Sequence, residues 1–346
     1  MKEHLDVAPV RDRSRNPIMS LAASVSILLT AFSARAQEPA PAAQPYPTPS
    51  ADPAAIPVSS DASALPPAPE TPKPKPPPYS LPWQLRPAAA ATVIRSDTAF
   101  GFRKPAAGSG TTVAETLLFS YKVTPEFAPM VRVGVVSDKP PVGDSGFAFL
   151  NPVVGGTYVI KLSPSVRLAL FLGLTVPVGS GGGNTPDKTV APARTAGVFT
   201  RSAFDNAMFA VNYMTVFPGV DLAYVAGGLT VQAEATIFEL FRVKGDLVDR
   251  DSTRTNFTTG LHIGYFVAPI FSLGADLRYQ AWVSNPMIPD GSPLRDTVTV
   301  AVGPRFHFKL SDKAWFRPGI AYARGIDDPM ADQKYNVVQL DLPFSF

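Results

Sequence analysis

The chain of 346 residues has no cysteine, only three histidines and only 17% charged residues. Without cysteine there can be no disulfide framework, thiolate metal site or cysteine nucleophile. Lys and Arg number 31 against 28 Asp and Glu, so the net charge of +3 is too small to suggest a nucleic-acid partner. No run of 18 apolar residues occurs after residue 88, which excludes a membrane-spanning helix in that part of the chain.

The first 36 residues have the three parts of a signal peptide. Several arginines precede an apolar stretch over 18–32, and Ala34-Arg35-Ala36 is a small-x-small cleavage site. The alternative is a membrane anchor, but the stretch is shorter than the roughly 20 residues that a spanning helix needs. We therefore expect residues 1–36 to be removed during export.

Residues 37–87 are predicted to be a disordered, proline-rich periplasmic linker. They hold 17 of the 38 prolines, among alanine, serine and threonine. Such a composition cannot bury enough apolar surface to offset the entropy cost of ordering, and it favours extended polyproline II structure. The linker is either a spacer that touches the cell wall or a passive tail.

From residue 88 to the end, apolar residues alternate with polar and small ones at period two, which is typical of β-strands. The pattern is clearest at the C-terminus, where every second residue is apolar: Val338, Leu340, Leu342, Phe344 and Phe346. The same alternation, with turn residues between segments, predicts twelve strands: 91–103, 111–123, 127–137, 147–160, 166–178, 214–226, 229–242, 255–267, 271–283, 295–309, 315–325 and 335–346.

A soluble sandwich also alternates, but three features favour a transmembrane antiparallel up-and-down barrel over 88–346. The predicted strands are mostly 11 to 13 residues long, enough for the roughly 9–11 tilted residues that cross a bilayer. Short connections follow the even-numbered strands and longer ones the odd-numbered strands, which would place both ends of the barrel in the periplasm. The residues that alternate with the apolar ones in each strand are Gly, Ala, Thr and charged residues, as the inner face of a barrel requires. Apolar residues in 193–217 recur at helical spacing and suggest a loop helix over or inside the pore.

The chain thus resembles bacterial outer-membrane β-barrel proteins, most closely small porin-like solute-transport barrels. The most specific element is the terminal Phe346, preceded by Phe344, Leu342 and Leu340. The resemblance implies that these four residues are the signal read by the barrel-assembly machinery. It also implies an outer-membrane location in contact with lipid.

If the apolar set faces lipid, the alternate set lines the lumen. This set holds nine cationic groups against five carboxylates, which suggests a mild anion preference. Alternatively, the charges pair and close the lumen. The predicted pore-lining residues are Arg95, Asp97, Arg132, Asp221, Glu234, His262, Asp276, Arg278, Arg305, His307 and Asp341.

One contact follows from the position of a turn. If 268–270 is a three-residue turn, Tyr265 pairs with Leu273 on the outside and His262 with Asp276 on the inside. A carboxylate beside an imidazole favours the charged ring, so the pair is either a pH-sensitive element or a structural support of the wall.

No enzyme motif is recognised. A Gly-x-Ser-x-Gly elbow is absent, and 179–184 lacks the Lys-Ser/Thr of a phosphate loop. We predict no catalytic residue, no metal and no cofactor, and a channel or facilitator for small solutes. The first alternative is a structural envelope protein, a closed barrel that anchors the proline-rich arm; a surface lipid hydrolase is a third class.

Overall fold

The computed structural model describes residues 78–346, apart from 185–186 and 247–248. The chain divides into two units, Met1–Lys73 and Pro74–Phe346, and every described residue belongs to the second unit. The predicted signal peptide, and the predicted linker up to residue 77, lie outside the described residues and stay predictions.

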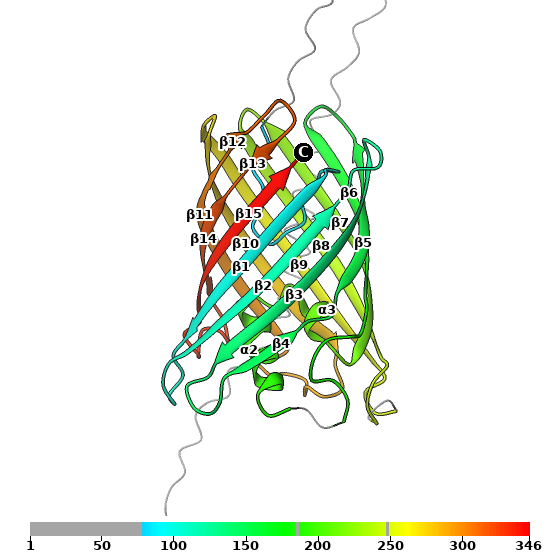
Figure 1. Ribbon diagram of the computed structural model, residues 1–346, viewed down its shortest axis with the longest axis vertical. Helices are drawn as coiled ribbons and strands as arrows, with labels where there is room; N and C mark the ends of the chain where they lie inside the picture. Colours follow the sequence, from blue (N-terminus) through cyan, green and yellow to red (C-terminus); the bar gives the residue numbers. More distant parts are fainter. Residues whose placement is uncertain (1–77, 185–186, 247–248) are drawn as a thin grey trace, which may run out of the picture. The chain divides into compact units, whose positions relative to one another are not determined.

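The second unit is a closed antiparallel β-barrel (Figure 1). Consecutive strands pair around the ring in the order β1-β2-β3-β5-β6-β7-β8-β9-β10-β11-β14-β15, and β15 pairs with β1 to close it. The strand bounds are β1 Val93–Arg103, β2 Gly110–Ser120, β3 Phe127–Lys139, β4 Gly146–Phe149, β5 Val153–Lys161, β6 Val166–Thr175, β7 Tyr213–Ala226, β8 Leu229–Arg242, β9 Thr253–Ala268, β10 Phe271–Ser284, β11 Asp296–Phe306, β12 Phe308–Lys309, β13 Trp315–Phe316, β14 Gly319–Gly325 and β15 Asn336–Ser345.

Twelve strands form the ring, as predicted, although three of them are interrupted. β4 and β5 both pair with β3 and are separated by a break at 150–152. β11 is separated from β12 at His307, and β13 from β14 at Arg317-Pro318. Proline has no amide hydrogen to donate to a ladder, which accounts for the breaks at Pro152 and Pro318.

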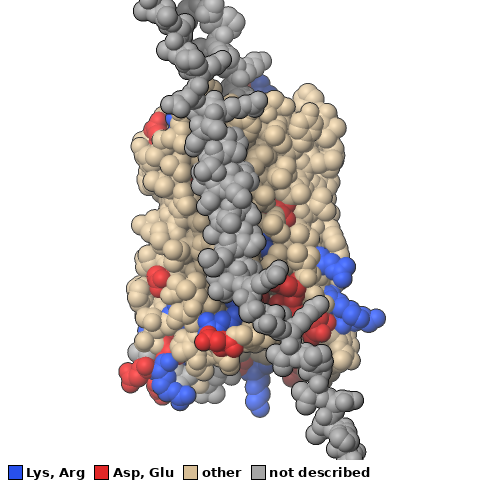
Figure 2. Space-filling model, turned by 180° about the vertical axis from the view of Figure 1, so that it is seen from behind, with Lys and Arg blue, Asp and Glu red and all other residues tan. Residues whose placement is uncertain are grey.

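The period-two alternation separates an apolar outer face from a polar inner face. Leu172, Val302 and Ile320 on the outer face are 58%, 57% and 47% exposed, whereas Asp221 and Gln339 on the inner face are fully buried. On the face shown in Figure 2, Lys, Arg, Asp and Glu are sparse over most of the wall and gather towards the end with the long loops. A wide apolar band of this kind is what a barrel presents to lipid.

The two ends of the barrel differ in their connections. Short turns lie at the end where the chain terminates (Figure 1), and the tightest is Gly227-Gly228 between β7 and β8. Their φ values are +56° and +85°, as a two-residue type I′ turn requires at both of its central positions.

The longest connection at the opposite end, 176–212, contains the helices α2 (Val190–Thr200) and α3 (Asn206–Phe209). The helical spacing noted in 193–217 therefore corresponds to real helices up to Phe209, after which strand β7 begins at Tyr213. Among the described residues, no helix combines the length and the apolar character needed to span a membrane.

An arginine on the outer face should destabilise the barrel according to its depth. Leu172 lies well inside β6, whereas Tyr265 lies close to the 269–270 turn. We expect Leu172→Arg to lower the free energy of unfolding in lipid vesicles by about 2–4 kcal/mol, and Tyr265→Arg by about 0–1 kcal/mol. Urea titration of the refolded proteins checks this, and equal costs at both positions would contradict a membrane-embedded wall.

Candidate functional site

All the predicted pore-lining residues lie on the inner face of the barrel. Their side chains are buried, except that of Arg132, which is 18% exposed. Because partner groups surround them in this structure, their role in lining an open pore stays a prediction. The predicted assembly residues Leu340, Leu342, Phe344 and Phe346 are partly or fully exposed on the outer side, and their role also stays a prediction.

Residues 78–92, which we call the N-terminal segment, precede β1 and lie inside the barrel near the end where the chain terminates (Figure 1). The Tyr79 hydroxyl donates a hydrogen bond to the side-chain oxygen of Gln232 on β8 and accepts one from the amide of Ala88 at 3.0 Å. The segment therefore enters the lumen, reverses direction and returns to β1. The residues up to 87 that the sequence assigned to the linker are part of this packed segment.

The tip of the N-terminal segment is held at Trp83. Its amide donates to Asp276 Oδ2 at 3.2 Å, and its carbonyl accepts a hydrogen bond from Arg95. The guanidinium of Arg305 lies over the indole at 4.4 Å. Arg95 and Arg305 share a single carboxylate, Asp341, at 2.6 and 2.5 Å. Strands β1, β10, β11 and β15 thus converge on one tryptophan.

Arg86 attaches the returning half of the N-terminal segment to β7 and β8. Its guanidinium lies 3.0 Å from Glu234 and 3.5 Å from Asp221. Its amide donates to Glu234 at 2.6 Å, and its carbonyl accepts from Gln232 at 2.5 Å. The two wall carboxylates, which the sequence leaves without an obvious cation, therefore find one on the N-terminal segment.

The connection 176–212, which we call the inserted loop, occupies the other end of the lumen. Arg201, fully buried, lies 2.8 Å from Asp97 on β1 and 2.8 Å from Asp205 on the loop itself. Asp205 also accepts from Arg132 on β3 at 2.6 Å. The loop is thus joined to β1 and β3, which flank β2 on one side of the wall, by a chain of four alternating charges.

The charges around Asp205 fix its ionisation. Burial by itself would raise the pKa of Asp205, but the guanidinium groups of Arg132 and Arg201 hold that pKa below its ordinary value. The carboxylate therefore stays charged at neutral pH and keeps both arginines paired.

The predicted register of β9 and β10 is confirmed. Tyr265 pairs with Leu273 on the outside, and His262 pairs with Asp276 on the inside with Nδ1 and Oδ1 2.7 Å apart. The other ring nitrogen of His262 lies 3.4 Å from the hydroxyl of Ser80 on the N-terminal segment. The histidine therefore touches both the wall and the N-terminal segment.

Sequence reasoning missed the lumenal role of residues 78–92. The signal that was present is the stretch Tyr79-Ser80-Leu81-Pro82-Trp83-Gln84-Leu85, which brings aromatic and leucine side chains into an otherwise Pro- and Ala-rich region. Arg201 and Asp205 were also missed, because they lie in a predicted loop outside the alternating pattern.

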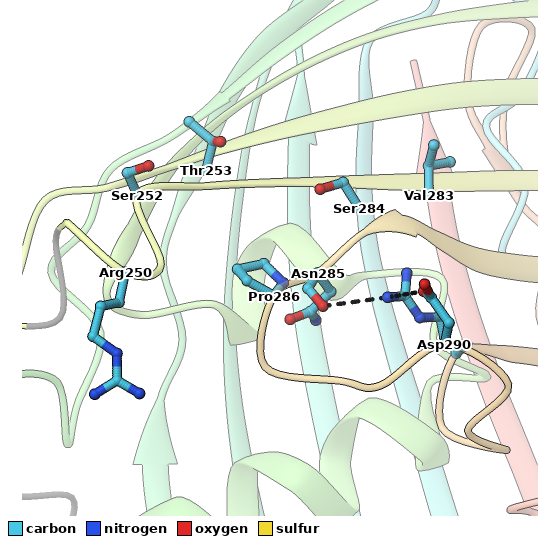
Figure 3. A pocket seen from close by; sticks show the side chains of 9 residues that line it. Arg250, Ser252, Thr253, Val283, Ser284, Asn285, Pro286 and Asp290 are labelled. Carbon is cyan, nitrogen blue, oxygen red and sulfur yellow. Dashed lines mark hydrogen bonds and ion pairs between the residues drawn. The ribbon is translucent and has the colours of Figure 1, made fainter.

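A surface pocket of about 370 Å³ opens at the long-loop end (Figure 3). Its lining is mostly polar, and in Figure 3 Arg250 points away from Asn285 and Asp290. Arg295 pairs with Asp290 at 2.6 Å and donates to the carbonyl of Ile288 at 2.8 Å. Arg295 therefore holds the connection between β10 and β11 in place. Within the described ranges, no group of three or more His, Asp or Glu side chains is placed to hold a metal ion.

No family model and no curated protein matches the chain. Among solved structures, it is similar to the COG4313 outer membrane channel from Pseudomonas putida F1, with 14% identity over 76% of this chain and 98% of that one and a TM-score of 0.49. It is also similar to the NanC porin, with 12% identity over 72% of this chain and 98% of that one and a TM-score of 0.44. The β domain of the Bordetella autotransporter BrkA is similar as well, with 14% identity over 75% of this chain and 99% of that one and a TM-score of 0.42. At identities this low, the similarities do not extend to what this chain transports or binds.

Removing the shared carboxylate should weaken the lumenal network strongly. Asp341→Asn would leave Arg95 and Arg305 buried without a counter-charge, so we expect the free energy of unfolding to fall by about 3–5 kcal/mol. Urea titration of protein refolded in detergent measures this. Asp290→Asn removes an ion pair of Arg295 whose carboxylate is 97% exposed, and it should change stability little; an equally small effect at Asp341 would contradict the network.

The inserted loop should loosen in acid. Because the folded-state pKa of Asp205 lies below that of an unfolded aspartate, its ionised form stabilises the loop above about pH 4. That stabilisation is lost as the pH falls through the folded-state pKa. The protection of amides over 190–212, taken relative to their intrinsic exchange rate at each pH, should therefore fall at low pH in the wild type, whereas Asp205→Asn should show low protection at every pH. Acid-independent protection in the wild type would contradict this.

Proposed function

We propose that this protein is a bacterial outer-membrane channel for the passive passage of small solutes, and that the N-terminal segment closes it at rest. Most of the inner wall is polar, which suits an aqueous path rather than a solid core. The segment takes no part in the strand pairing of the ring. It can therefore leave the lumen without breaking the backbone hydrogen bonds that pair the strands of the ring.

The observation that carries the proposal is a set of wall glycines that face the N-terminal segment. A Cβ on Gly260 would lie 2.9 Å from Leu85, and one on Gly319 would lie 2.5 Å from the Trp83 ring. Gly219, Gly264 and Gly274 likewise face segment residues. The wall thus leaves room at this level of the lumen, and the segment fills that room. A lumen closed by wall side chains alone would need no such glycines.

The contacts of the segment suit reversible docking. Its polar contacts join groups that water can also hydrate, such as Thr230, which accepts from the Ser80 amide at 3.0 Å, whereas Trp83 and Leu85 are buried against the wall. A hydrogen bond of this kind contributes only about 0.5–1.5 kcal/mol net, because hydration replaces it on release.

We also propose that the channel has a mild preference for anions. With the segment withdrawn, the wall at its level presents five arginines against four carboxylates, namely Arg95, Arg167, Arg278, Arg305 and Arg317 against Asp221, Glu234, Asp276 and Asp341. A surplus of one cation favours anions only slightly.

The placement of the protein in the envelope is proposed on the same physical grounds. Short turns face the periplasm in outer-membrane barrels, so the end with Gly227-Gly228 and the C-terminus belongs there. The partners would be outer-membrane lipid around the wall and the barrel-assembly machinery at Phe346. The rest of the predicted linker, residues 37–77, would extend into the periplasm, within reach of the cell wall.

The alternative is a structural envelope protein, a closed barrel that anchors the arm. The paired charges of the lumen favour it, since Asp97, Asp205 and Asp276 all have cationic partners in this structure. The two proposals differ in whether the lumen ever conducts.

A disulfide should distinguish them, because the chain has no cysteine of its own. In Ser80→Cys/Thr230→Cys, oxidation would fix the N-terminal segment to β8. We expect planar-bilayer recordings to be silent when the protein is oxidised and to show ohmic steps that become more frequent after reduction. A variant lacking residues 79–88 should conduct in either condition.

The single-cysteine variants are the matched controls and should not respond to reductant. If neither the reduced protein nor the deletion variant conducts, while both stay folded by circular dichroism, the channel is refuted and the structural anchor stands.

A further inference from the structure

A small internal cavity lies between the N-terminal segment and the inserted loop. Its volume is about 60 Å³. Gln84 and Arg86 bound it on one side, Phe204 and Asp205 on the other, and residues of β2, β3, β5, β6, β7 and β8 surround it.

One side of the cavity is aromatic, which is unusual for the inner face of this barrel. Phe171, Phe217 and Phe238 stand on the adjacent strands β6, β7 and β8 and line the cavity. The ring of Phe217 lies 5.6 Å from that of Phe171 and 5.1 Å from that of Phe238. Met130 and Met208 extend this apolar side. Thioethers also pack favourably against rings.

The other side is polar and contains an unsatisfied group. Both the oxygen and the nitrogen of the Gln84 side-chain amide are buried without a hydrogen-bond partner. Buried amides are rarely left unpaired, and leaving one unpaired costs free energy, so this amide disfavours the docked position of Gln84. Arg86 with Glu234 and Arg132 with Asp205 complete the polar side.

From this geometry we infer that the cavity is the binding site for a small planar aromatic solute that carries a hydroxyl or a carboxylate. The ring would stack on Phe217 and its neighbours, and the substituent would pair with Arg132, which stays on the wall. The inference rests on the proposed channel, because it names the class of solute that the channel passes.

Because the cavity is small, binding of the solute competes with closure of the lumen by the N-terminal segment. A dry cavity that accepts a benzene ring measures about 150 Å³, more than the 60 Å³ present here. The ring can enter fully only when Gln84 withdraws, and Gln84 belongs to the N-terminal segment. A bound solute therefore favours the withdrawn segment.

Isothermal titration of the purified full-length protein in detergent with 4-hydroxybenzoate tests the inference. We expect saturable binding, no binding of gluconate, and a loss of about 3- to 10-fold in affinity for Phe217→Leu, which keeps an apolar side chain but removes the ring. Phe119→Leu, on the outer face, is the matched control for uptake of the probe into detergent and should bind as the wild type does. The oxidised Ser80→Cys/Thr230→Cys protein should bind more weakly than the reduced one.

The outcomes separate this inference from the channel itself. If the reduced protein conducts but 4-hydroxybenzoate and gluconate behave alike, the solute class is wrong and the channel stands. If Phe217→Leu and Phe119→Leu change affinity equally, the binding lies outside the cavity and the inference falls. If binding follows Phe217 but nothing conducts, the site is real and the channel is refuted.

Discussion

Every ionised side chain in the lumen of this barrel needs an opposite charge or hydrogen-bonding partner, because water is excluded from most of it. The wall alone does not meet that need. Asp221 and Glu234 find their cation on the N-terminal segment, and Asp97 finds one at Arg201 of the inserted loop. Charge balance therefore ties the wall to both inserted elements, and neither the wall nor the insertions are electrostatically complete alone.

The two insertions are held differently. The inserted loop is covalently fixed at both ends, between β6 and β7, and packs an apolar face through Met208 and Phe209. The N-terminal segment joins the ring only at β1. It docks through hydrogen bonds and ion pairs, and it buries Trp83 and Leu85 against glycines of the wall. The element with a single attachment is the one suited to move, and the loop, which is attached at both ends, is suited to narrow the lumen permanently.

Most of the barrel could be predicted from sequence because a strand that faces lipid on one side and a lumen on the other must alternate at period two. The same regularity, counted from one turn, placed His262 opposite Asp276. The insertions could not be predicted in this way. The positions of Trp83 and Arg201 depend on residues more than a hundred positions away, such as Asp276 for Trp83 and Asp97 for Arg201. The alternation of apolar and polar residues within a strand carries no information about such contacts. The aromatic cavity likewise forms only where three strands and both insertions meet.

The seam between β1 and β15 has a consequence for the docking of the N-terminal segment. The docking site of Trp83 draws on β1, β10, β11 and β15, and these strands surround a common space only after the first and last strands have joined. A sheet whose first and last strands are unpaired offers Trp83 only part of this site, although β7 and β8 can still hold Arg86. The complete docking site of the segment is thus a property of the closed ring alone.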